Sequence, residues 1–544
     1  MVRLSFVSPN CYYFTTPLIF CKVSSSSLLF QIRFATLLAM IAKVYSAIPD
    51  GYEGSIVEVE GDMNRGLPAF NIVGMANKTI NEAKDRVRSA LVNSGFSFPD
   101  KKVTINLAPA ELMKNGTSLD LPIALAILVL SRQLLPRDIA DCLFAGELSL
   151  NGKIRPIRGV INIVECAKKS HFKRIFVPID NISQAKLVNG IEIIGISSLQ
   201  ELFMFLKQQL DITHLSTPNI VKNTTTDSTS VLLDHIRGQD FAKRAIAIAI
   251  AGHHNILISG PPGAGKTLLA KAAMNLLPDI TSEEQIAITK IHSLAHLTDN
   301  IVSARPFRAP HHTASATSII GGGINALPGE ISLSHYGVLF LDELPEFPRN
   351  ILEALRQPLE DKHITISRAN QKATYPADFM LIATMNPCPC GYAGDPTHEC
   401  TCTLQEIQKY HKKLSGPLFD RIDICVNVSK VDNSELSKPL SSENHQHNDV
   451  KNTIKRASQR QYSRYGKNNF YNSSLSSYQV TKLLPLKTAS EQFLFEASKK
   501  LDLSARGYFK VIKVARTIAD LENSKDIEKH HLAEALTFRA HIKT

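Results

Sequence analysis

Long apolar runs are missing from this 544-residue sequence, in which no stretch approaches the roughly 20 consecutive apolar residues that a membrane-spanning helix needs. A secretory signal is not indicated either, because no compact basic start leads into one apolar run and a small-residue cleavage site. With 44% hydrophobic and 20% charged residues, the composition is typical of a globular protein in water. We therefore expect a cytoplasmic protein without a membrane anchor.

Acidic residues are missing from the first part of the chain. Residues Met1 to Ala39 contain no Asp or Glu, are rich in Ser, Phe and Leu, and show no periodicity typical of a domain. A targeting segment would account for this composition. We favour a different interpretation, in which residues 1–39 are a non-native or disordered extension and translation starts at Met40, because an ordered-looking pattern begins directly after it.

Negative charge is also in deficit over the whole chain, which has a formal net charge of +11 and a pI of about 9.1. This excess of positive charge favours a polyanionic partner, most commonly nucleic acid, although simple solubility is an alternative explanation.

The nine cysteines show no disulfide framework, and four of them crowd between Cys388 and Cys402. That spacing suits a reducing compartment and a bound metal.

The chain is too long for one hydrophobic core, so we expect several domains in a mixed α/β protein. Residues 40–210 alternate strand-like and helix-like patterns and predict an α+β domain. Residues 232–435 contain a strand, loop and helix unit with further buried strands, which is typical of a nucleotide-binding sheet. Residues 451–544 show helical periodicity only, and the polar stretches 211–231 and 436–450 predict linkers.

A phosphate-binding loop is indicated between a predicted strand, His254 to Ser259, and a predicted helix, Thr267 to Leu277. Its glycines allow backbone N–H groups to approach phosphates at the helix N-terminus. We expect Lys266 to reach the β and γ phosphates of ATP and Thr267 to place its hydroxyl on Mg²⁺. The loop consists of Gly260, Pro261, Pro262, Gly263, Ala264, Gly265, Lys266 and Thr267.

An acidic pair follows the apolar strand predicted at Val338 to Leu341. We expect Asp342 to hold the same Mg²⁺ through its second coordination shell. Glu343 then stands where a carboxylate can orient and deprotonate the attacking water. The loop and the acidic pair together predict ATP hydrolysis, and a plain glycine-rich turn is the alternative.

On these motifs the segment from Leu232 to Leu521 resembles the magnesium-chelatase-like AAA+ ATPases, and the chain from Met40 resembles the ComM/YifB family. Asn386 in Ala-Thr-Met-Asn-Pro matches the family's sensor 1, Arg421 in Leu-Phe-Asp-Arg-Ile-Asp its arginine finger, and Arg506 in Leu-Ser-Ala-Arg-Gly its sensor 2. The resemblance implies a P-loop AAA+ core, a C-terminal helical lid domain and a homohexamer, since an arginine finger acts on a neighbour's nucleotide. Judged by residue type alone, both arginines would be surface ion pairs.

The stretch from Ile364 to Tyr375 predicts a hairpin directly before the sensor 1 strand, and it resembles the pre-sensor hairpin of ring helicases. A hairpin at this place would line a pore, where Lys362, Arg368 and Lys372 would follow a phosphate backbone regardless of its sequence. A solvated basic hairpin is the alternative.

The cysteine pairs Cys388-Pro-Cys390 and Cys400-Thr-Cys402 bracket a short loop. Four thiolates that meet around a tetrahedral Zn²⁺ would form a closed, structural site without an open position for catalysis. His398 is a substitute ligand to consider, and free or redox-active cysteines are the alternative.

Residues Ile56 to Leu206 resemble the proteolytic domain of Lon, and Ser118 falls at the position of that family's nucleophile. Ile161 and Ile163 stand where Lon proteases carry their lysine, and neither can accept a proton. We therefore expect an inactive assembly or DNA-docking module, in which any residual hydrolysis would need Lys114 or another nearby base.

Three functions follow as hypotheses. The ComM/YifB resemblance implies a hexameric ATP-driven motor that translocates on DNA or migrates its branches in recombination or DNA uptake. The alternative is a chelatase-like ATPase that remodels a protein partner, although the chelatase motor subunits lack the Lon-like domain and the cysteine insert. An ATP-dependent protease is disfavoured by the missing lysine.

Overall fold

The computed structural model describes most of the chain from Ile41 onward. The predicted extension 1–39 lies outside the described residues, as do most of the linker 211–231 and the first part of the linker 436–450. Residues 446–450 of the second predicted linker instead begin a long helix. The described residues are 41–74, 78–112, 114, 117–210, 231–295, 297, 300–323, 326–368, 371–395, 398–431 and 446–539.

The N-terminal domain is built on a seven-stranded mixed sheet with the order β3-β4-β2-β1-β5-β8-β9. Strand β2 pairs antiparallel with β1 and with β4. The other neighbouring pairs, β3–β4, β1–β5, β5–β8 and β8–β9, are parallel. The strands are β1 Ala42–Asp50, β2 Glu53–Asn64, β3 Ala69–Val73, β4 Lys102–Ala108, β5 Cys142–Phe144, β8 Arg174–Pro178 and β9 Glu192–Ile196. A small separate hairpin pairs β6 Glu147–Leu148 with β7 Ile154–Arg155.

Helices cover both faces of this sheet, because alternate side chains of the central strands point to opposite faces. Val44 and Ile48 of β1 belong to the core shared with α2, α3 and α6, whereas Ala47 belongs to the core shared with α4. Every residue of α3 is buried. These helices are α2 Lys78–Asn93, α3 Asp120–Leu130, α4 Val160–Lys169, α5 Ile182–Ala185 and α6 Leu199–Leu206.

A five-stranded parallel sheet with the order β11-β14-β17-β10-β18 forms the second domain. The strands are β10 Ile256–Ser259, β11 Phe307–Arg308, β14 Val338–Leu341, β17 Met380–Met385 and β18 Ile424–Asn427. Since parallel strands end at the same edge, the residues that follow β10, β14 and β17 come together there. The longer helices of this domain are α7 Asp240–Gly252, α8 Lys266–Leu276, α9 Ser282–Leu294 and α14 Leu404–Lys412.

Short elements decorate this sheet. Helices α12 Arg349–Ala354 and α13 Arg356–Asp361 lead into an antiparallel hairpin, β15 His363–Arg368 and β16 Gln371–Pro376, directly before β17. The hairpin predicted before the sensor strand is thereby confirmed. The remaining short elements are α10 Ala316–Ile320, β12 Gly321–Gly322, β13 Leu327–Pro328, α11 Glu330–Leu333 and α15 Gly416–Phe419.

Residues 446–539 contain helices and no strand. They are α17 Gln446–Tyr465, α18 Ser477–Leu483, α19 Thr488–Lys500, α20 Ala505–Leu521 and α21 Lys529–Thr537. Their apolar faces share one core with α7 and α8, against which α17 and α20 pack. No helix among the described residues combines the length and the apolar character of a bilayer span.

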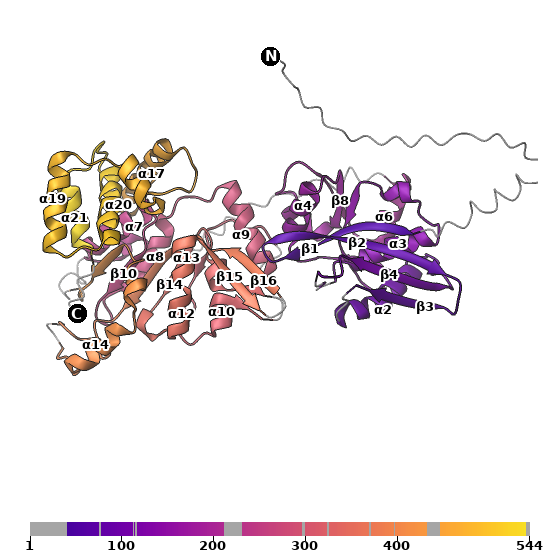
Figure 1. Ribbon diagram of the computed structural model, residues 1–544, viewed down its shortest axis with the longest axis horizontal. Helices are drawn as coiled ribbons and strands as arrows, with labels where there is room; N and C mark the ends of the chain where they lie inside the picture. The colour runs from indigo at the N-terminus through magenta and orange to yellow at the C-terminus, as the bar shows by residue number, and fades with distance from the viewer. Residues whose placement is uncertain are drawn as a thin grey trace, which may run out of the picture.

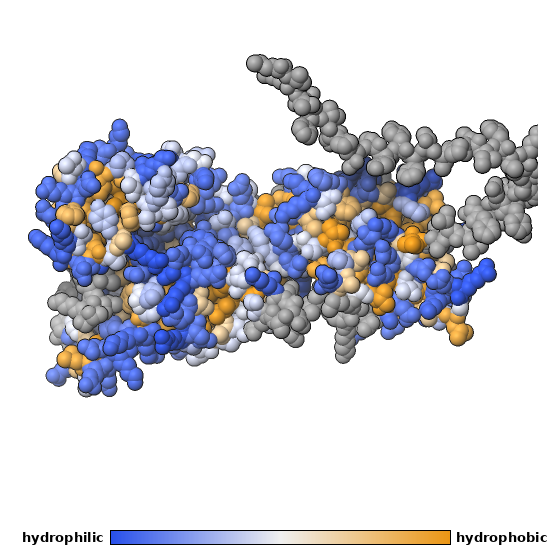
Figure 2. All heavy atoms as spheres, viewed as in Figure 1, coloured by the Kyte–Doolittle hydropathy of each residue, from blue (hydrophilic) through white to orange (hydrophobic). Residues whose placement is uncertain are grey.

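The two sheets lie in separate lobes that meet at α4 and α9 (Figure 1). Lys290 of α9 pairs with Glu165 of α4 at 2.6 Å, and its ammonium lies 3.9 Å from the centre of the Tyr52 ring. The β1–β2 turn also reaches the β15–β16 hairpin, since a Cβ on Gly51 would stand 3.3 Å from the Cβ of Ala373. Figure 2 shows that apolar side chains on this face of the molecule form scattered patches among polar ones.

Candidate active site

The predicted phosphate-binding loop joins β10 to α8. Gly263 and Gly265 have φ angles of 78° and 82°, which favour glycine, and a Cβ on either would meet no other atom within 4 Å. The space over these two glycines is therefore open, at the N-terminus of an 11-residue helix. Backbone N–H groups and the positive end of the helix dipole make this a cradle that fits the phosphates of a nucleotide.

The side chain of Lys266 lies inside this loop. Its Nζ donates to the carbonyl oxygens of Gly260 and Pro261, at 2.6 and 3.1 Å, and to Oδ1 of Asn386 at 2.9 Å. Burial lowers the pKa of Lys266 below its usual value. The structure thus brings the expected phosphate-binding lysine against the expected sensor 1 side chain, although 120 positions separate them in the sequence.

The acidic pair stands beside the loop at the end of β14. Oδ2 of Asp342 lies 3.5 Å from the hydroxyl of Thr267. These are the two groups that we expect to hold Mg²⁺, and their oxygen atoms suit that ion. Magnesium bound there would neutralise charge on the phosphate oxygens.

Thr384 of β17, which the sequence analysis missed, joins the two acids. Its hydroxyl donates to Oδ1 of Asp342 and accepts from the backbone N–H of Glu343 at 3.0 Å. Glu343 has a φ of 53°, which costs a non-glycine residue energy, and such strain persists where surrounding contacts hold it. The signal was the Thr of Ala-Thr-Met-Asn-Pro, two positions before Asn386.

The two expected arginines share one carboxylate, that of Glu360, and no hydrogen bond between described residues joins either of them to the loop. Arg421 donates to the carbonyl oxygens of Arg356 and Pro417 and to Oε2 of Glu360. Arg506 donates to Oε1 of the same carboxylate at 3.2 Å. Glu360, the last residue but one of α13, was also missed from the sequence, since nothing in its local pattern distinguishes it.

The expected nucleic-acid contacts differ in their surroundings. Lys362 directly follows α13, at the base of the hairpin. It forms an ion pair with Asp378 at 3.1 Å within the same chain. Although burial alone would raise the pKa of Asp378, the charge of Lys362 helps to bring it below its usual value. Lys372, opposite Ser367, is exposed. The side chain of Arg368 and residues 369–370 lie outside the described part of the structure.

The four clustered cysteines converge after β17. The Sγ atom of Cys388 lies 3.3 Å from that of Cys390 and 3.7 Å from that of Cys400, and the last two are 3.6 Å apart. All four sulfur atoms, Cys402 included, lie within 4.8 Å of one another. Tetrahedral ligands at the usual Zn–S length would be about 3.8 Å apart, so the donor set and its spacing fit Zn²⁺.

The cysteine cluster touches the phosphate-binding loop. A Cβ on Gly391 would stand 2.8 Å from ring atoms of Pro262, so the backbone between the cysteines packs closely against the loop. His398 does not join the sulfurs, because its ring stacks on Tyr392 at 4.9 Å and its Nδ1 lies 3.1 Å from the ammonium of Lys430.

Among the described side chains, no base pairs with the serine at the position of the Lon nucleophile. Ser118 is 8% exposed, and the ammonium of the fully buried Lys114 donates to the carbonyl oxygen of Pro109. Burial lowers the pKa of Lys114. Ile161 and Ile163 belong to α4 and are fully buried in the core that this helix shares with the sheet. No hydrogen bond between described side chains links Ser118 to Lys114, so this geometry does not assemble a Ser–Lys dyad.

Known proteins resemble the chain over nearly its full length. It is 41% identical to the competence protein ComM of Haemophilus influenzae over 512 residues, covering 92% of this chain and 98% of that one. It is 41% identical to YifB of Escherichia coli over 497 residues, covering 90% and 95%. The chain belongs to the ComM/YifB family. Lon protease 2 of Bacillus subtilis is 31% identical over 166 residues, covering 27% of this chain and 29% of that one.

Three family descriptions agree with this placement in the ComM/YifB family. Magnesium chelatase, subunit ChlI, matches residues 232–436; subunit ChlI of Mg-chelatase matches residues 59–181; and the ChlI C-terminal region matches residues 444–539. The match over residues 232–436 covers the sheet that carries the phosphate-binding loop and the acidic pair. Membership of this AAA+ group implies that the chain binds and hydrolyses ATP with Mg²⁺.

Proposed function

We propose that this ComM/YifB-family protein is a hexameric cytoplasmic motor that uses ATP hydrolysis to translocate on DNA and migrate its branches, in recombination or DNA uptake. The observation that carries the proposal is the β15–β16 hairpin, which projects directly before the strand that holds Thr384 and Asn386. Its exposed Lys372 offers a contact for a phosphate backbone, and the net charge of +11 favours such a partner. The name of the Haemophilus relative, a competence protein, fits DNA uptake.

In this proposal the residues at the strand ends hydrolyse ATP. Lys266 exchanges its contacts with loop carbonyls for contacts with the β and γ phosphates, and Thr267 and Asp342 hold Mg²⁺. Glu343 takes a proton from the water that attacks the γ phosphate, while Asn386 orients that water. The cysteine insert holds a structural Zn²⁺ and supports the loop through Gly391.

Ring assembly completes the site in the same proposal. Arg421 reaches the γ phosphate of the neighbouring subunit, where its charge offsets the charge that develops during hydrolysis, and Arg506 acts as sensor 2. Both arginines must then leave Glu360, which holds them in the single chain. The N-terminal lobe has a Lon-like fold without protease activity and serves assembly or DNA docking.

The test is the ATPase rate of the protein from Met40 onward, measured with and without single-stranded and forked DNA at low and moderate salt. Lys266→Ala is the control for contaminating ATPases. We expect DNA to stimulate the rate, and the stimulation to weaken with salt because phosphate contacts release counterions. A rate that no DNA changes would refute the motor and favour a second candidate, a chelatase-like ATPase that remodels a protein, which the magnesium-chelatase matches support.

A further inference from the structure

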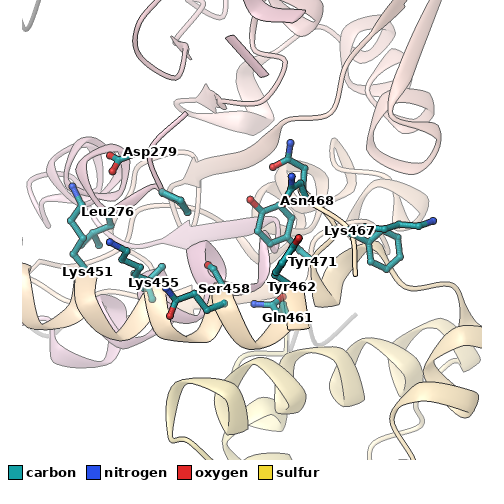
Figure 3. A pocket seen from close by; sticks show the side chains of 15 residues that line it. Leu276, Asp279, Lys451, Lys455, Ser458, Gln461, Tyr462, Lys467, Asn468 and Tyr471 are labelled. Atoms are coloured by element: carbon teal, nitrogen blue, oxygen red, sulfur yellow. The ribbon is translucent and has the colours of Figure 1, made fainter. Parts of the chain in front are cut away.

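A groove of about 350 Å³ lies between the end of α8 and helix α17 (Figure 3). One wall is the segment from Leu276 to Asp279, the other is a face of α17, and the loop 467–471 closes one end. Its volume is at the small end of the range for ligand pockets. The groove is separate from the phosphate-binding loop, because it stands at the opposite end of the 11-residue α8, roughly 16 Å along the helix axis.

Positive charge and an exposed aromatic ring line this groove. Lys451 and Lys455 project from successive turns of one face of α17, and Tyr462 lies on the same side two turns further along, as Figure 3 shows. Within the described ranges, Lys451 and Lys455 make no ion pair, and both are exposed. Lys467 adds a third cation from the end loop, against the single acidic side chain of Asp279. The ring of Tyr462 is 53% exposed, so an aromatic face is available beside the lysines.

Hydrogen bonds from residues outside the groove hold its walls in place. Arg305 donates to the carbonyl oxygens of Pro278 and Asp279, at 2.7 and 3.3 Å, and so fixes the first wall. Buried Asn472 fixes the end loop, because its backbone N–H donates to Oε1 of Gln461 at 2.8 Å and its side chain donates to Asp520 at 3.0 Å. The groove therefore exists before any ligand arrives, which reduces the entropy cost of binding.

We propose that this groove binds a segment of single-stranded nucleic acid. Phosphate groups lie on Lys451 and Lys455, and one base stacks on Tyr462. This combination of a basic track and a stacking platform is how proteins bind single strands without regard to sequence. A groove of this size does not admit a duplex, whose paired bases cannot reach the tyrosine ring. The choice of polymer rests on the proposed function, and the surface is distinct from the β15–β16 hairpin.

The test measures binding of a labelled oligo(dT) to the full chain by fluorescence anisotropy over a series of salt concentrations. We expect Tyr462→Ala to weaken binding about 5- to 150-fold and Tyr462→Phe to retain it, because phenylalanine still stacks. We expect the double variant Lys451→Gln, Lys455→Gln to lower the slope of log affinity against log salt by about 1.4, or about 0.7 for each lost phosphate contact. Thermal unfolding checks that each variant folds.

The matched control is Lys499→Gln, Lys500→Gln, which removes the same charge from exposed lysines of α19 in the same helical region. An equal loss of slope in this control would overturn the groove in favour of general electrostatics. Oligo(dT) binding that survives in both groove variants, but is lost in Lys372→Glu, would overturn the groove and keep the proposed function. No binding by the unaltered protein would refute both. Competition by free thymidine monophosphate as strong as by oligo(dT) would overturn the single-strand proposal and make the groove a mononucleotide site instead.

Discussion

Replacing Thr384 by valine removes one hydroxyl from beneath the acidic pair and leaves the shape of the residue almost unchanged. The hydroxyl is fully buried, donates to Asp342 and accepts from the N–H of Glu343. A hydrogen bond to a charged group is worth about 1.5–3 kcal/mol, and the N–H of Glu343 would lose its partner as well. The valine variant therefore loses the contacts that hold the carboxylate of Asp342 and the backbone of Glu343 in place.

If the lost constraint appears in the barrier to hydrolysis, 1.5–3 kcal/mol corresponds to a fall in kcat of about 10- to 150-fold. ATP affinity should change little, because no hydrogen bond between described residues joins Thr384 to Lys266 or to the glycines of the loop. The assay is phosphate release at saturating ATP, beside binding of a fluorescent ATP analogue, with sedimentation to check that assembly is unchanged.

Thr384→Ser is the matched control, since serine keeps the hydroxyl and loses only a buried methyl group, which costs about 1 kcal/mol of folding stability. It should restore most of kcat. The reasoning is refuted if the valine variant stays within about twofold of the unaltered enzyme, or if serine lowers kcat as far as valine does.

Three further changes test other parts of the protein. Glu343→Gln should bind ATP normally and hydrolyse it at least about 100-fold more slowly, and normal phosphate release would contradict its role as base. Cys390→Ser should lower bound zinc, seen by elemental analysis, and weaken ATP binding because the cysteine insert packs on the phosphate-binding loop; unchanged zinc would disprove the site. Lys290→Met leaves Glu165 unpaired and should destabilise the junction of the lobes by about 1.5–3 kcal/mol in chemical unfolding. The control Lys169→Met removes an exposed ion pair and should cost under about 1 kcal/mol. Equal losses of stability in the two variants would argue against a role of Lys290 at the junction.

The sequence predicted those parts of the site that depend on short, local patterns. A glycine-rich loop between a buried strand and a helix, and two acids directly after another buried strand, need no knowledge of distant residues. The parallel sheet then explains why Lys266 and Asn386 meet, since both follow strands that end at one edge.

What the sequence could not supply are contacts between segments that only the folded chain brings together. Glu360 is one of many acidic residues on a helix surface, and nothing local marks it as the common partner of Arg421 and Arg506. Lys362 looked like a free hairpin cation, but it is held by Asp378 from the other side of the hairpin. In each case the ion pair is decided by tertiary packing rather than by residue type.

The hairpin and the acidic pair are connected through one strand. From Pro376 at the end of β16 the chain passes through Asp378 directly into β17, where Thr384 holds both acids and Asn386 contacts Lys266. The Lys362–Asp378 pair fixes the start of this path. In the proposed motor, force on the hairpin would act along β17 and reach the residues expected to position the attacking water. The proposed motor needs a link between its load and its hydrolysis step, and in this proposal the link would consist of buried strand β17 and the hydroxyl of Thr384.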